Sequence, residues 1–308
     1  MAAISPTAGA GELKQNVPLG IALMLLGFLM FSANDALGKW LAETYSPFQI
    51  LMVRSIAAGA ILSPFILRAG IASMFALEQR GLHVLRIFFA TAEVFCFYSA
   101  VSGLPLADCL TYYLAGPIYV TVLAALVLKE RVGWRRWTAV GVGFVGVLIA
   151  LRPSTGVFTM HSAIALIGSL LYSGFLVTTR TLRSAPDLPM AGWQVVGAFL
   201  LGAAGAPFQW APIAHGQDVL LLGLLGVTAL IAILCVNRSL KLAPASVVVP
   251  YQYTLIVWAV LFGYFVFGDV PSWRVVLGAA IIVAAGLFIF FREQVVEEEP
   301  KVQVASGQ

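Results

Sequence analysis

The chain has 308 residues, of which 60% are hydrophobic and only 10% are charged, and its mean hydropathy is +0.95. Because a soluble domain carries about 25% charged residues, this chain cannot cover a water-facing surface, and lipid must surround most of it. The net charge of +4 is spread over short gaps between apolar runs rather than one basic face, which argues against a nucleic-acid-binding protein.

Apolar runs long enough to cross a bilayer follow one another along nearly the whole sequence. A spanning helix needs about 20 mostly apolar residues, and short connections that contain proline separate the runs. Polar segments at 1–17 and 293–308 are expected to be tails. We predict an all-α polytopic membrane protein with ten transmembrane helices, at 18–40, 47–67, 83–103, 107–128, 134–151, 159–182, 190–208, 218–238, 245–267 and 273–291.

The distribution of lysine and arginine predicts the orientation, because cytoplasmic connections carry an excess of both. With both tails in the cytoplasm, the outside segments hold only Lys39, Arg152 and Arg274. The inside segments then hold Lys14, Arg68, Arg80, Arg86, Lys129, Arg131, Arg135, Arg136, Arg180, Arg183, Arg238, Lys241, Arg292 and Lys301. This bias favours an even number of crossings, with both ends of the chain inside.

The sequence contains a weak internal repeat. A shift of 139 residues places, among other pairs, Pro105 on Pro244 and Trp134 on Trp273, without a gap. The shift corresponds to five predicted helices, so the second copy must enter the membrane from the opposite side. We therefore predict two five-helix units, 18–152 and 153–292, as a 5+5 inverted-topology repeat, which is a plan common among secondary transporters.

Several short motifs carry a family resemblance. The first unit contains YSAVSGLPLAD at 98–108, GP at 116–117, KERV at 129–132, WRRW at 134–137 and GFVG at 143–146. The second unit contains the weaker counterparts SLKLAP at 239–244, GD at 268–269 and WR at 273–274. These motifs resemble the EamA domain of the drug/metabolite transporter (DMT) superfamily. The resemblance implies two five-helix bundles around a central cavity and no ATPase module.

The segment FSANDALGK at 31–39 looks like bacterial members of that superfamily, which include amino-acid exporters and carriers of riboflavin or S-adenosylmethionine. The implied location is the inner membrane of a bacterial cell. The direction of transport and the coupling ion come from this resemblance alone, whereas a zwitterionic or aromatic solute also suits a cavity with both charge signs and tyrosines.

Ionisable residues inside the predicted helices are candidates for function, because each costs roughly 2.5–3.5 kcal/mol to insert. Asp35 and Lys39 share one face of the first helix, and Arg54 lies at similar depth in the second. A cation here could hold a substrate carboxylate, or the three residues could neutralise one another and lock the helices. Glu93, near the middle of the third helix, is the candidate for a coupling proton or a substrate ammonium group, with a structural carboxyl as the alternative.

Aromatic residues form the second set of candidates. The repeat places Tyr112 and Tyr251 in the helices that line the cavity of the resembled fold, where tyrosines could stack on a planar solute. The interfacial belt is the alternative position for tyrosine and tryptophan. Further candidates for the cavity are Tyr98, Tyr113, Tyr172, Trp258, Gln252 and Asn237.

Neither catalytic residues nor a metal or cofactor site is predicted. Cys96, Cys109 and Cys235 lie in or beside apolar runs and are expected to be small buried hydrophobic residues. Small residues such as Gly141 and Gly278, on the fifth and tenth helices, permit close helix packing, with a dimer face as the alternative. The expected partners are a small-molecule substrate and the bilayer, in a monomer or weak homodimer.

The preferred function is a secondary transporter that exports amino acids, including aromatic ones, and related metabolites by alternating access. The alternative is uptake of a vitamin or nucleoside-type solute such as riboflavin or S-adenosylmethionine. A membrane-embedded enzyme is a remote alternative because no clustered Asp/His set is visible. A channel would favour a repeated polar stripe along a pore, which the sequence also lacks.

Overall fold

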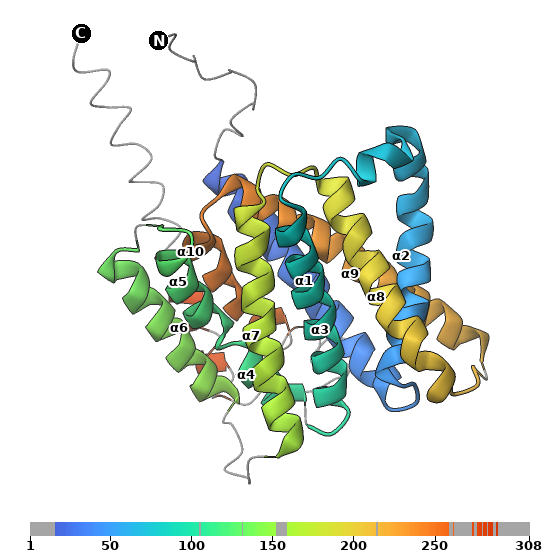
Figure 1. The fold of residues 1–308 in the computed structure, drawn as a ribbon. Coiled ribbons are helices and arrows are strands. Elements are labelled where there is room, and N and C mark those ends of the chain that lie inside the picture. Colours follow the sequence, from blue (N-terminus) through green and yellow to red (C-terminus); the bar gives the residue numbers. More distant parts are fainter. Residues whose placement is uncertain are drawn as a thin grey trace, which may run out of the picture.

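A computed structural model describes residues 16–104, 106–130, 132–151, 159–213 and 215–258, together with 261, 273, 276–278, 280, 281, 283–285 and 288. Over these residues the chain is helical, with no strand (Figure 1). Six helices are long and apolar enough to cross a membrane: Val17–Ala42, Pro47–Ala69, Arg80–Val101, Met160–Thr181, Asp187–Phe208 and Gly216–Leu242. Four shorter apolar helices accompany them: Gly116–Leu126, Trp137–Gly146, Ala245–Trp258 and Val276–Ala285. Ten crossings therefore stay a prediction.

The long helices begin where the sequence supplies caps. At the start of α1 (Val17–Ala42), the side chain of Asn16 accepts a hydrogen bond from the Leu19 amide. Ser46 does the same for Gln49 at the start of α2 (Pro47–Ala69), and Thr159 for Ser162 at the start of α7 (Met160–Thr181). Such side-chain acceptors satisfy amides that no helical carbonyl can reach. The other long helices are α3 (Arg80–Val101), α8 (Asp187–Gly205) and α9 (Gly216–Leu242).

The predicted fourth helix, 107–128, is wrong as a single element. The chain forms α4 (Leu106–Tyr113), a turn at Leu114–Ala115, and α5 (Gly116–Leu126). Pro117 lies in the first turn of α5, where its missing amide is tolerated, and it cannot donate a hydrogen bond to the Tyr113 carbonyl four residues earlier. After α5 the chain continues into α6 (Trp134–Leu151).

The predicted ninth helix is also irregular in its described part. It starts as a four-residue α10 (Ala245–Val248) and tightens into the 3-10 segment η3 (Val249–Thr254), which contains Pro250. The predicted tenth helix, 273–291, and both tails fall largely outside the described residues. Two short 3-10 segments, η1 (Ile71–Met74) and η2 (Ala206–Phe208), lie in the connections.

The main helix pairs follow the repeat. Helix α1 packs along α9, α3 packs along α7, and α2 packs against α8 (Figure 1). A shift of 139 residues carries α1 onto α7, α2 onto α8 and α3 onto α9. The first two pairs therefore exchange into each other, and the third maps onto itself. This is the pattern that a two-fold relation between the halves requires.

The polarity of the bundle is that of a membrane protein. Large apolar side chains such as Phe65, Leu67 and Phe88 are exposed on the outer faces of the helices. Polar side chains lie inside: Gln49, Arg86, Asn237 and Gln252 are almost fully buried. Intramembrane polar residues of this kind face the protein interior and are the usual markers of a solute pathway.

Candidate functional site

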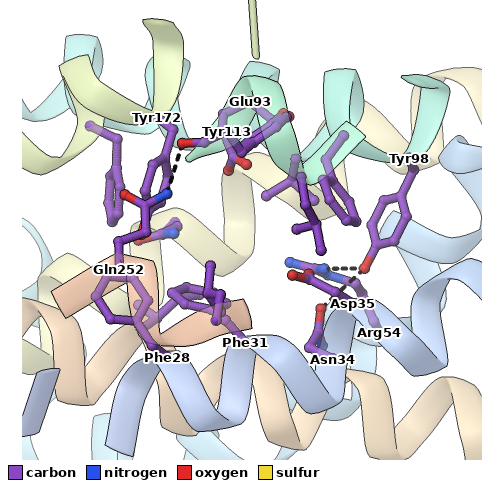
Figure 2. A pocket seen from close by; sticks show the side chains of 17 residues that line it. Phe28, Phe31, Asn34, Asp35, Arg54, Glu93, Tyr98, Tyr113, Tyr172 and Gln252 are labelled. Atoms are coloured by element: carbon purple, nitrogen blue, oxygen red, sulfur yellow. Dashed lines mark hydrogen bonds between the residues drawn. The ribbon is translucent and has the colours of Figure 1, made fainter. Parts of the chain in front are cut away.

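A cavity lies within the bundle, between helices α1, α2, α3, α4, α7, α8 and α9 and the segment η3 (Figure 2). It encloses about 670 Å³ of empty space, including space open to solvent. Sites for small molecules usually combine apolar walls with a few polar groups, as this lining does. The lining consists of Phe28, Phe31, Asn34, Asp35, Arg54, Glu93, Val94, Phe97, Tyr98, Leu110, Tyr113, Tyr172, Phe175, Gln194, Ile233, Gln252 and Leu255.

Three charged residues line this cavity, two carboxylates and one guanidinium. Asp35 comes from α1, Arg54 from α2 and Glu93 from α3. Among the described residues no carboxylate oxygen lies within 4.0 Å of the Arg54 guanidinium. The predicted mutual neutralisation of Asp35, Lys39 and Arg54 therefore does not take the form of direct ion pairs.

A chain of hydrogen bonds fixes Arg54 instead. Its Nη1 donates to the Tyr98 hydroxyl at 2.8 Å, and that hydroxyl lies 3.3 Å from Oδ1 of Asn34. The guanidinium carbon also lies 5.6 Å from the centre of the Tyr98 ring. Gly38 makes room for this tyrosine, because a Cβ there would approach Tyr98 Cε1 to 2.7 Å. Arg54 is thus held in place by neutral groups and keeps its charge available to the cavity.

Asn34 connects this chain to the second half of the protein. Its Nδ2 donates to the Leu225 carbonyl at 2.8 Å and to the Thr228 hydroxyl at 3.0 Å, both on α9. The cationic side of the cavity therefore joins α1, α2, α3 and α9.

Aromatic rings form the opposite side of the cavity (Figure 2). The Tyr172 ring meets the Phe31 ring nearly edge-on, at 6.5 Å and 83°, and lies 6.5 Å from the Tyr113 ring. Tyr113 meets Phe97 edge-on at 5.4 Å and 89°. The Tyr113 hydroxyl donates to the backbone carbonyl of Glu93 at 3.3 Å, so this wall also positions the part of α3 that carries the carboxylate.

The two halves of the repeat meet at this wall. Nε2 of Gln252 donates to the Tyr113 carbonyl at 3.0 Å, and these two residues are 139 positions apart, which is the shift of the repeat. Under a two-fold relation, a residue that contacts its own counterpart lies near the axis. Residues of the irregular segments α4 and η3 therefore lie where such an axis would cross the cavity.

The structure brings most of the predicted site residues together. Asp35, Arg54, Glu93, Tyr98, Tyr113, Tyr172 and Gln252 all line the cavity. Lys39 lies one turn beyond Asp35 and outside the lining. Tyr112 is partly buried against the core, Tyr251 is buried within it, and Trp258 is partly buried with its Nε1 unpaired among the described atoms.

Tyr112 and Tyr251, which were predicted to line the cavity, are not among the residues that line this one. The repeat located the two segments correctly but not the face that each presents. Leu110 and Tyr113 lie three residues apart on one face of α4 and line the cavity, whereas Tyr112 is not part of that face. Next to the two predicted tyrosines in the sequence, Tyr113 and Gln252 line it instead.

Other lining residues were missed from the sequence. Asn34 and Gln194 carry no charge, so hydropathy does not single them out, although both are buried amides in helices. Arg86, which was counted among the cytoplasmic charges, lies inside α3 and is only 1% exposed. Arg86 lies seven residues before Glu93 on the same helix face, and this spacing could have identified it from the sequence.

Comparison with known proteins identifies the family. The model of the EamA-like transporter family matches residues 18–152 and 160–291. The chain belongs to this family. It is therefore a multi-pass membrane protein and a transporter of the DMT superfamily.

Two relatives of this chain have names that state what they transport. An S-adenosylmethionine uptake transporter of Rickettsia prowazekii is 23% identical over 89% of this chain and 93% of its own length. A riboflavin transporter of Vibrio cholerae is 28% identical over 90% of this chain and 95% of its own length. One crystal structure, 18% identical in sequence, matches with a TM-score of 0.78 over 92% of this chain and 100% of its own, which shows that the two proteins share a fold.

Proposed function

We propose that this EamA-family protein is a secondary transporter that binds a small organic solute in the central cavity and carries it across a bacterial inner membrane by alternating access. The observation that carries the proposal is the cavity itself, where Asp35, Glu93 and Arg54 lie among aromatic rings. A ring-bearing solute with both a cationic and an anionic group fits this lining. A carboxylate can neutralise an ammonium group, a guanidinium can hold a carboxylate, and tyrosines can stack on the ring.

The proposal includes ten crossings in two inverted five-helix units, with both tails in the cytoplasm. The exchange of helix pairs and the contact of Gln252 with its own repeat counterpart support it. Rocking of one half against the other around a site near the axis is how such repeats alternate access.

Contacts at one end of the bundle support a closed gate on the predicted cytoplasmic side. The Glu130 carboxylate accepts the amides of Ala245 and Ser246 at 3.2 and 3.1 Å, and it pairs with Arg180 at 3.4 Å. Arg180 also donates to the Leu240 carbonyl at the end of α9, at 2.7 Å. These contacts join the ends of α7, α9 and α10, and we propose that they separate when the cavity opens inward.

Two substrate assignments compete within this proposal. Export of amino acids is supported by the mixed charges of the cavity. Uptake of S-adenosylmethionine or riboflavin is supported by the names of the relatives in addition to the aromatic wall. The excess of carboxylates over guanidinium in the lining favours S-adenosylmethionine, which carries two cationic groups and one carboxylate, over riboflavin, which carries neither.

Solute flux into proteoliposomes tests the function. Vesicles of the purified protein, preloaded with unlabelled S-adenosylmethionine, riboflavin or tryptophan, are placed in the matching radiolabelled solute. We expect one of the three to be accumulated by exchange, with no change in its chemical structure. Conversion of the solute without vectorial uptake would instead indicate an enzyme, and accumulation equal to that of empty liposomes for all three would contradict the assignment.

A further inference from the structure

The most deeply buried cation in the described part of the chain is Arg86 on α3. Its Nε donates to the Thr179 hydroxyl at 2.8 Å and its Nη1 to the Met190 carbonyl at 3.1 Å. Its Nη2 donates to Oε1 of Gln194 at 2.9 Å and to Oδ1 of Asn237 at 2.8 Å. One guanidinium thus contacts α7, α8 and α9 at once.

All of these partners are neutral. Within the described residues no carboxylate oxygen lies within 4.0 Å of Arg86. Two further buried groups nearby lack a hydrogen-bond partner among the described atoms: Nδ2 of Asn237, whose side chain is fully buried, and Nε2 of His83, one turn before Arg86. A buried charge without a counter-ion is strongly unfavourable, and an intramembrane cation therefore indicates a functional site.

Two side chains that line the cavity contact this guanidinium. Gln194 lines the cavity and accepts a hydrogen bond from Arg86. Phe175 also lines the cavity, and its ring lies 4.9 Å from the guanidinium carbon. Rotation of Gln194 would therefore be enough to present Arg86 to the contents of the cavity.

We propose that Arg86, with Thr179, Gln194 and Asn237, forms an anion subsite that takes a carboxylate-type group when the cavity reorganises. The carboxylate replaces the Gln194 carbonyl on the guanidinium, and the free amide of Asn237 donates to it. Glu93 lies seven residues further along the same face of α3, about 10 Å away by helical rise. A zwitterionic solute then contacts the carboxylates of the cavity lining at one position along its path and Arg86 at the next. The identity of the anion, though not the existence of the subsite, rests on the proposed function. The anion is either the carboxylate of the transported solute or a free anion.

Acetate is the direct probe, with acetamide as its neutral isostere. We expect acetate to raise the unfolding temperature of the detergent-solubilised protein by about 2 °C near saturation, while acetamide leaves it unchanged. The acetate shift should survive in Arg86→Lys in reduced form and disappear in Arg86→Gln. Equal shifts with acetate and acetamide, or a full acetate shift in Arg86→Gln, would overturn the proposal.

A second variant keeps the test decisive if Arg86→Gln does not fold. Gln194→Glu supplies Arg86 with a carboxylate, so we expect this variant to be more stable than the wild type and insensitive to acetate. The matched control is Gln49→Glu, at a buried glutamine that instead bonds the Ala211 backbone at 2.8 and 2.9 Å. That variant should be less stable and should keep the acetate response. An acetate shift that persists in Gln194→Glu contradicts the subsite.

A third comparison separates the source of the anion from the existence of the subsite. S-adenosylmethionine and its decarboxylated form are compared as stabilising ligands in the wild type and in Gln194→Glu. A preference for the carboxylate-bearing form that is lost in Gln194→Glu assigns the subsite to the solute, and an acetate response without such a preference assigns it to a free anion. If proteoliposomes carry none of the solutes while the acetate response depends on Arg86, the proposed function fails and the subsite stands.

Discussion

The cavity combines charges that do not cancel within the protein. Arg54 is engaged by the Tyr98 hydroxyl, while Asp35 and Glu93 line the same space. With all three ionised, the lining carries one excess negative charge in a region where water is scarce and charge interactions are strong. Such a site favours either a cationic group on the solute or a proton on one carboxylate.

Replacing Glu93 by glutamine tests whether this carboxyl group carries a coupling proton. The change preserves size and removes both the charge and the titration. We expect the initial transport rate to fall at least tenfold, and the dependence of that rate on pH between 5 and 8 to flatten. Flux assays across this pH range measure both quantities. An unchanged rate and pH profile would remove Glu93 from ion coupling.

Neighbouring tyrosines provide a matched pair for the aromatic wall. Tyr113 lines the cavity and Tyr112 does not. We expect Tyr113→Leu to raise the KM for a ring-bearing solute by about fivefold, equivalent to about 1 kcal/mol of lost stacking. Tyr112→Leu should leave KM within twofold of the wild type. A larger rise in KM for Tyr112→Leu than for Tyr113→Leu would instead place Tyr112 in the binding site.

The charged residues of the site were easier to predict from the sequence than the uncharged polar residues. Asp35, Arg54 and Glu93 are conspicuous in apolar helices and were identified from the sequence. Asn34 and Gln194 act through hydrogen bonds to partners 108 to 194 positions away, which no local pattern reveals.

At the scale of elements, two corresponding segments depart from regular helix. The turn between α4 and α5 and the 3-10 segment η3 bring Tyr113 and Gln252 into contact. Paired interruptions of this kind indicate a binding site in transporters built from repeats. Periodicity and hydropathy could predict both segments but not these breaks, because the apolar composition continues through them.

Close helix packing around the cavity depends on individual glycines. On α9, a Cβ at Gly226 would approach the Arg54 carbonyl of α2 to 2.2 Å, whereas a Cβ at Gly223 meets nothing within 4 Å. We expect Gly226→Ala to destabilise the protein by about 1–3 kcal/mol and to displace Arg54. Gly223→Ala should be neutral or stabilising, by up to about 1 kcal/mol. Thermal unfolding in detergent measures both changes, and equal stabilities of the two variants would contradict the described α2–α9 contact.

For the whole molecule, the composition predicted that lipid surrounds most of the chain. The lysine and arginine pattern predicted the orientation of the chain in the membrane. The structure agrees on a multi-pass helical bundle, with Phe65, Leu67 and Phe88 directed outward. Its described part shows six long helices, and a turn and a 3-10 segment interrupt the predicted fourth and ninth helices. Arg86, Arg180 and Lys241 were counted among the cytoplasmic charges, and the structure shows all three buried within helices.

Tags on the two ends test the predicted topology. An epitope at either terminus should be accessible to antibody only after the inner membrane of spheroplasts is permeabilised. A tag on the periplasmic face of an inner-membrane protein of known topology, which antibody should reach in intact spheroplasts, serves as the control. Labelling of one terminus in intact spheroplasts would place the ends on opposite faces and exclude two inverted units of five helices.

The central claim is that one cavity, lined by Asp35, Glu93 and Arg54, is reached in turn from each side of the membrane. The most direct measurement uses Val94→Cys, within the lining, in a protein whose Cys96, Cys109 and Cys235 are replaced. A membrane-impermeant maleimide should modify this cysteine from either side of oriented vesicles, and the transported solute should slow both reactions. Reaction from one side only, at a rate that the solute does not change, would contradict alternating access through this cavity.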